Sequence, residues 1–102
     1  YTHTTDCVLE NCDIKGGYKL GGVIGYICSG GTAKAVDNNT LTNCTVAGTD
    51  GQYAGGKSEY VMGRVVGNFN TDGFCQNNTI SNMTTDATEN IGLIEAGKTV
   101  QQ

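Results

Sequence analysis

The residues of this chain that could do chemistry are few and scattered. It has one histidine, His3, and five cysteines. A zinc site needs closely spaced Cys and His ligands, and no Cys-x-x-Cys pair occurs. A catalytic nucleophile would need a Cys/His pair or a Gly-x-Ser-x-Gly turn, and neither is present. We therefore expect no catalytic residue, no metal ligand and no cofactor.

The cysteines divide into two groups. Their number is odd, so at least one is free or pairs between chains. Cys12 and Cys44 occupy the same place in a repeat described below, and we predict that they are small buried hydrophobes. Cys28 and Cys75 lie in turn-like segments, so these two, with Cys7, are the candidates for a disulfide.

Carboxylates are scattered along the chain. Asp13, Asp37 and Asp86 could gather on one exposed face, as carboxylates do in the β-helix enzymes that cleave acidic polysaccharides. A groove three repeat units long would be short for that reaction, so such an enzyme is the least favoured function. Asp50-Gly51 and Asp72-Gly73 are typical turn dipeptides and lack the regular Asp spacing of a calcium loop.

Two surface chemistries involve sugars. The sequence Asn-x-Thr occurs at Asn38, Asn43, Asn77 and Asn82, and Asn38 and Asn77 are the better candidates for glycosylation. Tyrosines could instead form a surface that stacks on sugar rings, or they could cover the ends of the fold, and the sequence leaves both readings open. These tyrosines are Tyr18, Tyr26, Tyr53 and Tyr60.

An internal repeat organises the chain around these residues. Residues 38–45 read Asn-Asn-Thr-Leu-Thr-Asn-Cys-Thr, and residues 77–84 read Asn-Asn-Thr-Ile-Ser-Asn-Met-Thr. An earlier copy spans 8–14. A second motif, Gly-x-apolar-apolar-Gly, recurs in the same order at 21–26 and 63–68, and the segment 91–95 follows the third copy. Two motifs that repeat in one order indicate stacked units that bury apolar faces against their neighbours.

Short strands are the predicted elements, because Gly and β-branched residues interrupt every helical window. The tail 91–100 has a loosely helical pattern, weakened by Gly92 and Gly97. Strands are predicted near 7–10, 12–15, 18–28, 33–36, 40–42, 44–47, 59–69, 79–81, 83–85 and 91–95.

The apolar spacing around the repeated Asn predicts a bend. Leu41 and Cys44 are three residues apart, so a plain strand would place them on opposite faces. A left-handed Asn43 between them would return both to the inside. The predicted Asn ladder is Asn11, Asn43 and Asn82. The predicted inner stacks are Leu9, Leu41 and Ile80; Cys12, Cys44 and Met83; Val23, Val65 and Leu93; and Ile24, Val66 and Ile94.

These residues resemble a known repeat. Gly22-Val23-Ile24-Gly25-Tyr26, followed by a Gly/Thr stretch and by residues 41–48 (Leu-Thr-Asn-Cys-Thr-Val-Ala-Gly), resembles the GLUG repeat. That family occurs in bacterial surface and secreted proteins. The resemblance covers most of residues 5–95 and implies a β-solenoid-like structure, an extracellular location and an adhesive or structural role. Arg64 and Glu95 depart from its glycines.

Size and charge limit the other classes. The 102 residues suffice for one domain, and 37% apolar content favours a thin core. Net charge is −4 and the six basic residues are scattered, so we expect no nucleic-acid partner. No apolar run approaches the roughly 20 residues that span a bilayer, so we expect no membrane insertion. Because the sequence begins with Tyr1 rather than Met, we expect a processed product or part of a longer chain.

The sequence therefore predicts a single all-β domain over 1–102, a short parallel β-helix or β-solenoid of about three units near 5–37, 38–76 and 77–102. Such a fold ends in unpaired strand edges. We expect a non-enzymatic structural protein, a filament subunit or adhesin module that pairs with copies of itself. A carbohydrate-binding module, with Tyr18, Tyr26, Tyr53 and Tyr60 on glycans, is the alternative.

Overall fold

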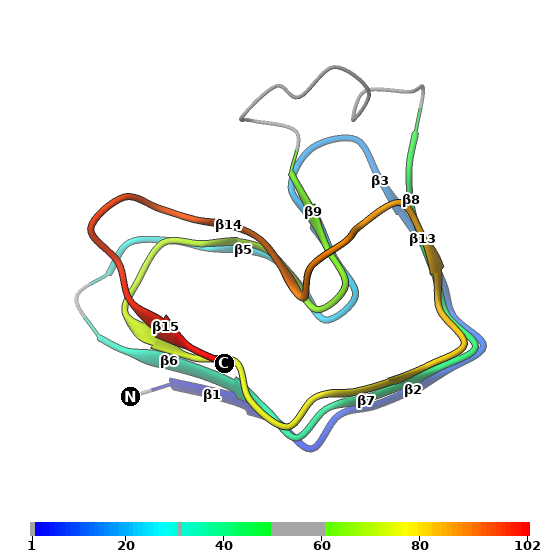
Figure 1. Ribbon diagram of the computed structural model, residues 1–102, viewed down its shortest axis with the longest axis horizontal. Helices are drawn as coiled ribbons and strands as arrows, with labels where there is room; N and C mark the ends of the chain where they lie inside the picture. The colour runs from blue at the N-terminus through cyan, green and yellow to red at the C-terminus, as the bar shows by residue number, and fades with distance from the viewer. Residues whose placement is uncertain (1, 31, 50–60) are drawn as a thin grey trace.

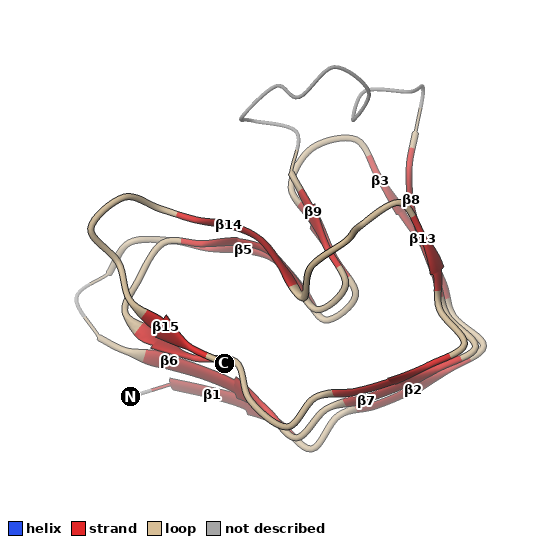
Figure 2. Ribbon diagram, in the orientation of Figure 1, coloured by secondary structure: helices blue, strands red, loops and turns tan. Residues whose placement is uncertain are grey.

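The computed structural model describes residues 2–30, 32–49 and 61–102, and these ranges contain strands but no helix (Figure 2). The strands are β1 (Thr2–Thr5), β2 (Val8–Glu10), β3 (Asp13–Gly16), β4 (Leu20–Gly21), β5 (Ile24–Ile27), β6 (Lys34–Asp37), β7 (Thr40–Thr42), β8 (Thr45–Gly48), β9 (Met62–Gly63), β10 (Val66–Phe69), β11 (Gly73–Phe74), β12 (Thr79–Ser81), β13 (Thr84–Thr85), β14 (Ile91–Ile94) and β15 (Val100–Gln101).

The chain follows nearly the same path three times, as the superposed ribbons of Figure 1 show. We call each circuit a pass: β1 to β5 form the first, β6 to β10 the second and β11 to β14 the third. Each strand pairs in parallel with the strand at the same place in the next pass. Leu41 of β7, for example, lies opposite Leu9 of β2 and Ile80 of β12.

The strands of the described ranges form five parallel sheets. Their strand orders are β1-β6-β11-β15, β14-β10-β5, β12-β7-β2, β13-β8-β3 and β4-β9. The expectation of an all-β fold with parallel strands is confirmed. β15 pairs with β11 and is the fourth strand of the first of these sheets.

Two corners of each pass are left-handed. Asp6, Asn38 and Asn77 form the first corner and have φ of 58–60°. Asn11, Asn43 and Asn82 form the second, with φ of 55–56°. Asn and Asp adopt this conformation more readily than other side chains, so the repeated Asn sets the bend at the same place in each pass. The bend returns both flanking apolar residues to the interior: Leu41 is 0% exposed and Cys44 is 1% exposed.

Glycines allow a third bend, which points inward in Figure 1, where β4 and β9 approach β5, β10 and β14. A Cβ atom on Gly67 would lie 2.4 Å from the carbonyl oxygen of Gly25 and 2.7 Å from the nitrogen of Leu20. A Cβ atom on Gly63 would lie 2.7 Å from the nitrogen of Gly92. The Gly-x-apolar-apolar-Gly motif therefore marks backbones packed against backbones, where a side chain has no room.

The core lies mainly inside the lobe formed by the sheets β14-β10-β5 and β1-β6-β11-β15. Among the described residues, Phe69 is the largest fully buried side chain. Its cluster also contains Ile27, Val36, Val65, Val66, Cys75 and Ile91.

The strand expected near 91–95 is present as β14, which pairs with β10, and β15 pairs with β11 further along the tail. Other strand expectations need correction. The expected strand 18–28 is two short strands, since the chain bends at Gly22. Gly73 begins β11 rather than completing a turn with Asp72, and β1 at the N-terminus was not predicted at all.

Candidate functional site

Two inner stacks lie where the repeat places them. Leu41 is fully buried between its register partners Leu9 and Ile80, which are half-buried. Cys44 is buried too, and backbone hydrogen bonds from Thr45 to Cys12 and from Thr84 to Cys44 continue its column through the passes. The half-buried members belong to the first and third passes, so the apolar columns reach both ends of the stack.

The third inner column differs from the sequence expectation. Ile91, not Ile94, lies opposite Val66, and Ile24 lies on its other side. Leu93 lies opposite Asn68 rather than Val65, and Ile94 lies opposite Phe69. The expected groupings of Leu93 with Val23 and Val65, and of Ile94 with Ile24 and Val66, are therefore wrong.

Glycine packing explains this shift. The register places Gly92 in line with Gly67 and Gly25. A Cβ atom on Gly92 would lie 2.7 Å from the carbonyl carbon of Met62, so this place also requires glycine. Gly92 is therefore the equivalent of Gly25 and Gly67, the last glycine of the motif, rather than of Gly22 and Arg64 as the expected grouping implied.

The predicted Asn ladder lies on the surface. Asn11, Asn43 and Asn82 share the second corner, and their side chains are exposed. The Asn82 side-chain amide donates to Oδ1 of Asn43 at 2.7 Å. This bond joins neighbouring passes, as the predicted ladder requires. Asn38 and Asn77, the glycosylation candidates, lie at the first corner and are also exposed.

A second, buried Asn ladder was missed. Oδ1 of Asn39 accepts a hydrogen bond from the backbone N–H of Cys7 at 3.0 Å. One pass later, Oδ1 of Asn78 accepts one from the backbone N–H of Asn39 at 3.0 Å. The side chain of Asn78 also donates to the carbonyl of Val36 at 2.8 Å. The Asn-Asn doublet in both copies was the signal: its first Asn makes the bend and its second points inward.

The cysteines are all free, so the proposed disulfide among Cys7, Cys28 and Cys75 is not formed. Cys75 is buried in the core, whereas Cys28 is exposed. Cys7 belongs to the first pass, and the second pass separates it from Cys75. Burial, reinforced by the nearby Asp37 carboxylate, raises the pKa of the Cys75 thiol from 9.0 to about 11, while a hydrogen bond from Asn78 opposes the shift.

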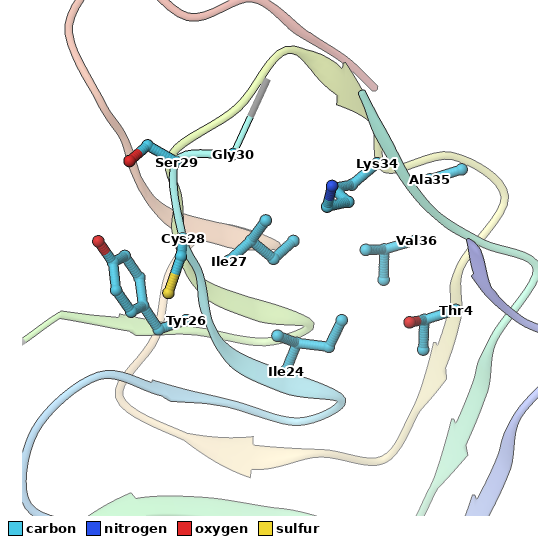
Figure 3. Close-up of a pocket in the computed structure, with 10 residues that line it drawn as sticks. All are labelled: Thr4, Ile24, Tyr26, Ile27, Cys28, Ser29, Gly30, Lys34, Ala35 and Val36. Atoms are coloured by element: carbon cyan, nitrogen blue, oxygen red, sulfur yellow. The ribbon is translucent and has the colours of Figure 1, made fainter. Parts of the chain in front are cut away.

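An apolar pocket of about 390 Å³ lies at the level of the first pass (Figure 3). Ile24 and Ile27 of β5 point into it, as does Val36 of β6. The first pass has Ile27 and Thr4 where the second has Phe69 and Val36. This smaller and more polar pair leaves the core less filled at the first pass.

The tyrosines are grouped only in part. Tyr18 is 55% exposed and Tyr26 is 43% exposed. The Lys19 ammonium lies 4.2 Å from the centre of the Tyr18 ring and 4.8 Å from that of Tyr26. A cation this close to two ring faces is attracted by both. Tyr53 and Tyr60 lie outside the described residues.

The three carboxylates considered above lie in different parts of the fold. Asp13 is exposed on β3 and pairs with Lys15 at 3.5 Å. Asp37, on a different sheet, accepts a hydrogen bond from the backbone N–H of Gln76 at 2.9 Å. Asp86 is exposed beyond β13. Among the described residues, no three His, Cys, Asp or Glu side chains are placed to hold a metal ion together. No helix in the described ranges could cross a membrane.

Comparison of the chain with protein-family models, with curated proteins and with solved structures gives no match.

Proposed function

We propose that the three passes form a short β-solenoid of the GLUG-repeat type, and that the protein is a structural subunit or module of an extracellular filament or surface adhesin. Copies of the chain would add end to end. Support for the solenoid comes from strands, left-handed corners and glycine approaches that recur at the same places in successive passes. The extracellular location rests on the repeat's resemblance to bacterial surface proteins.

The observation that carries the proposal is a pair of unpaired strand edges. Within the described ranges, β2, β3 and β5 each pair on one side only, and so do β12, β13 and β14 at the opposite end. An unpaired edge presents backbone N–H and C=O groups that can pair with another chain. The apolar pocket at the first pass adds surface that a second copy would cover.

The two ends differ, which determines the kind of assembly. One is the edge of the first pass and the other is the edge of the third. A contact between unlike ends is heterologous, and such a contact builds an open filament unless rotation closes a ring. A chain with this architecture needs no reactive group, because backbone pairing and the burial of apolar columns provide the attraction.

Negative-stain electron microscopy of the purified protein tests the proposal. We expect filaments from the unmodified chain. Ile94→Lys, which places a charge at the half-buried end of the column Ile27–Phe69–Ile94, should abolish them while the monomer keeps its β circular dichroism. Ala96→Lys adds the same charge at an exposed position and should leave filaments intact. Isolated particles from the unmodified chain would reject self-assembly.

One observation favours carbohydrate binding as a second function. Lys19, Tyr18 and Tyr26 present two exposed rings and a cation together, and rings of this kind can stack on sugars. Tyr26→Ala should weaken binding to a polysaccharide that shifts tyrosine fluorescence. Val8→Ala, another exposed apolar position, should not. The absence of any shift across a broad glycan panel would reject this function.

A further inference from the structure

We propose that the third pass of one copy pairs in register with the first pass of the next, and that β1 of the incoming copy replaces β15 beside β11. This inference rests on the proposed end-to-end assembly and deepens it, because it states which residues meet and which strand has to leave.

The register of β11 defines the exchange. Gly73 lies opposite Lys34 of β6 on one side and Val100 of β15 on the other. Lys34 is in turn the partner of Thr2 in β1. Val100 and Gln101 therefore occupy the places that the first two residues of β1 would hold in a further pass. The incoming β1 and the resident β15 compete for one edge.

β15 holds this edge with few contacts. Gly73 donates to the carbonyl of Thr99 at 3.0 Å, and Cys75 donates to that of Gln101 at 2.7 Å. The Thr99 N–H bonds Asp72 Oδ1 at 2.9 Å, and Val100 packs against the core. β15 pairs over two residues, whereas β1 pairs with β6 over four. Exchange would thus extend pairing past Phe74 toward the corner at Asn77.

In the other columns, the junction would place residues of the same kind next to each other. In this register Leu9 of the next copy lies on Ile80, Ile24 lies on Ile91 and Asn11 lies on Asn82. These pairings repeat the ones already made between passes within a chain. The first-pass pocket would then be covered by the third pass of the neighbouring copy.

One bond of the internal stack is missing at the junction. Within the chain, the backbone N–H of Cys7 and then that of Asn39 each donate to an Asn side chain in the next pass. The N–H of Asn78 would face Cys7 of the next copy, which has no amide oxygen. The junction is therefore weaker than the contact between passes, and filaments should break there and leave intact monomers.

Disulfide trapping tests the register. In a Cys28→Ser background, Glu10→Cys with Ser81→Cys places two exposed thiols opposite each other only across the junction. Adjacent parallel strands are about 4.8 Å apart, within reach of a disulfide. Within one copy, β7 separates the same two positions, so they are about 9.6 Å apart and cannot bond. We expect a ladder of linked multimers on non-reducing gels. The off-register pair Glu10→Cys with Thr79→Cys should give at most one-tenth as much linked product.

A substitution in β15 tests the exchange. Val100→Asp should release β15 from the core and lower the protein concentration needed for assembly about fivefold. In the unmodified chain, replacing β15 exposes the Val100 side chain, which is roughly half buried against the core, and the variant does not lose this burial. Gln102→Asp, at an exposed position beyond β15, adds the same charge and should leave that concentration unchanged.

The outcomes separate this inference from the function on which it rests. Filaments with equal trapping at the matched and off-register pairs would overturn the register but keep self-assembly. Trapping at the matched pair with no effect of Val100→Asp would overturn the replacement of β15. If neither the unmodified chain nor any variant assembles, end-to-end assembly itself is wrong.

Discussion

Asn39 and Asn78 bond each other twice across neighbouring passes: the backbone N–H and the side-chain amide of Asn39 both donate to Oδ1 of Asn78, each at 3.0 Å. Asn39 is fully buried. After the left-handed residue of the first corner, the Asn side chain of the next pass accepts the backbone N–H bond in place of a backbone carbonyl. The passes are therefore held in register at a bend as well as along the strands.

Replacing this amide should be costly. Asn39→Ala removes the acceptor for the Cys7 N–H and the donor to the carbonyl of Thr4, leaving buried polar groups unsatisfied. We expect a loss of about 3 kcal/mol in the free energy of unfolding. Urea denaturation checks this. Asn43→Gly removes an exposed amide but keeps the positive φ accessible, and it should cost less than about 1 kcal/mol.

The glycine approach should be equally sensitive. Gly67→Ala places a methyl group 2.4 Å from the carbonyl oxygen of Gly25 in β5 and 2.7 Å from the nitrogen of Leu20 in β4, and neither backbone atom can move aside without separating its strand from β10. We predict destabilisation of about 3 kcal/mol or more, measured by thermal or urea unfolding. The matched change Gly30→Ala meets only the Cys28 carbonyl oxygen at 4.0 Å. Equal stability of the two variants would show that the backbones do not pack this closely.

Stability should fall in mild alkali. Because the folded pKa of Cys75 is about 11 and its ordinary value is 9.0, the thiol is protonated in both states below pH 9. Between pH 9 and 11 the unfolded chain loses this proton and the folded chain keeps it, so unfolding becomes easier by up to about 3 kcal/mol. Urea unfolding at pH 8 to 11 measures the loss. In Cys75→Ala the same curve should be flatter, and parallel curves would contradict this assignment.

Thiol labelling should distinguish the cysteines. Cys28 is exposed and should react with a maleimide at pH 7.5 within minutes, while buried Cys44 and Cys75 should react only on unfolding. Mass spectrometry of peptides after timed labelling reads each site. Rapid labelling of Cys44 in the folded protein would mean that the inner stack opens readily.

Much of the stacking could be predicted from the repeat alone. The pairs Leu41 with Ile80 and Val23 with Val65 follow from aligned copies, and the left-handed Asn43 follows from a three-residue apolar spacing that a plain strand cannot satisfy. These features depend on local rules for Asn and Gly and on repetition, both of which are visible in one sequence.

The rest depended on contacts between distant segments. From the sequence, Gly92 could be aligned with Gly22 or with Gly25, and only the approach of β9 decides between them. β15 is two residues long and carries no pattern of its own, so its pairing with β11 follows from the edge that is available rather than from propensity. The first-pass pocket depends on side-chain volumes in three strands and has no sequence signature.

The connections between equivalent strands differ greatly in length. Three residues separate β3 from β4 in the first pass, while 13 separate β8 from β9 in the second, yet Leu20 and Met62 remain partners. Chain length at this place is independent of the pairing on either side. It is consequently a natural graft point, where a foreign peptide or epitope could be inserted between β8 and β9 without changing how these two strands are paired with their neighbours.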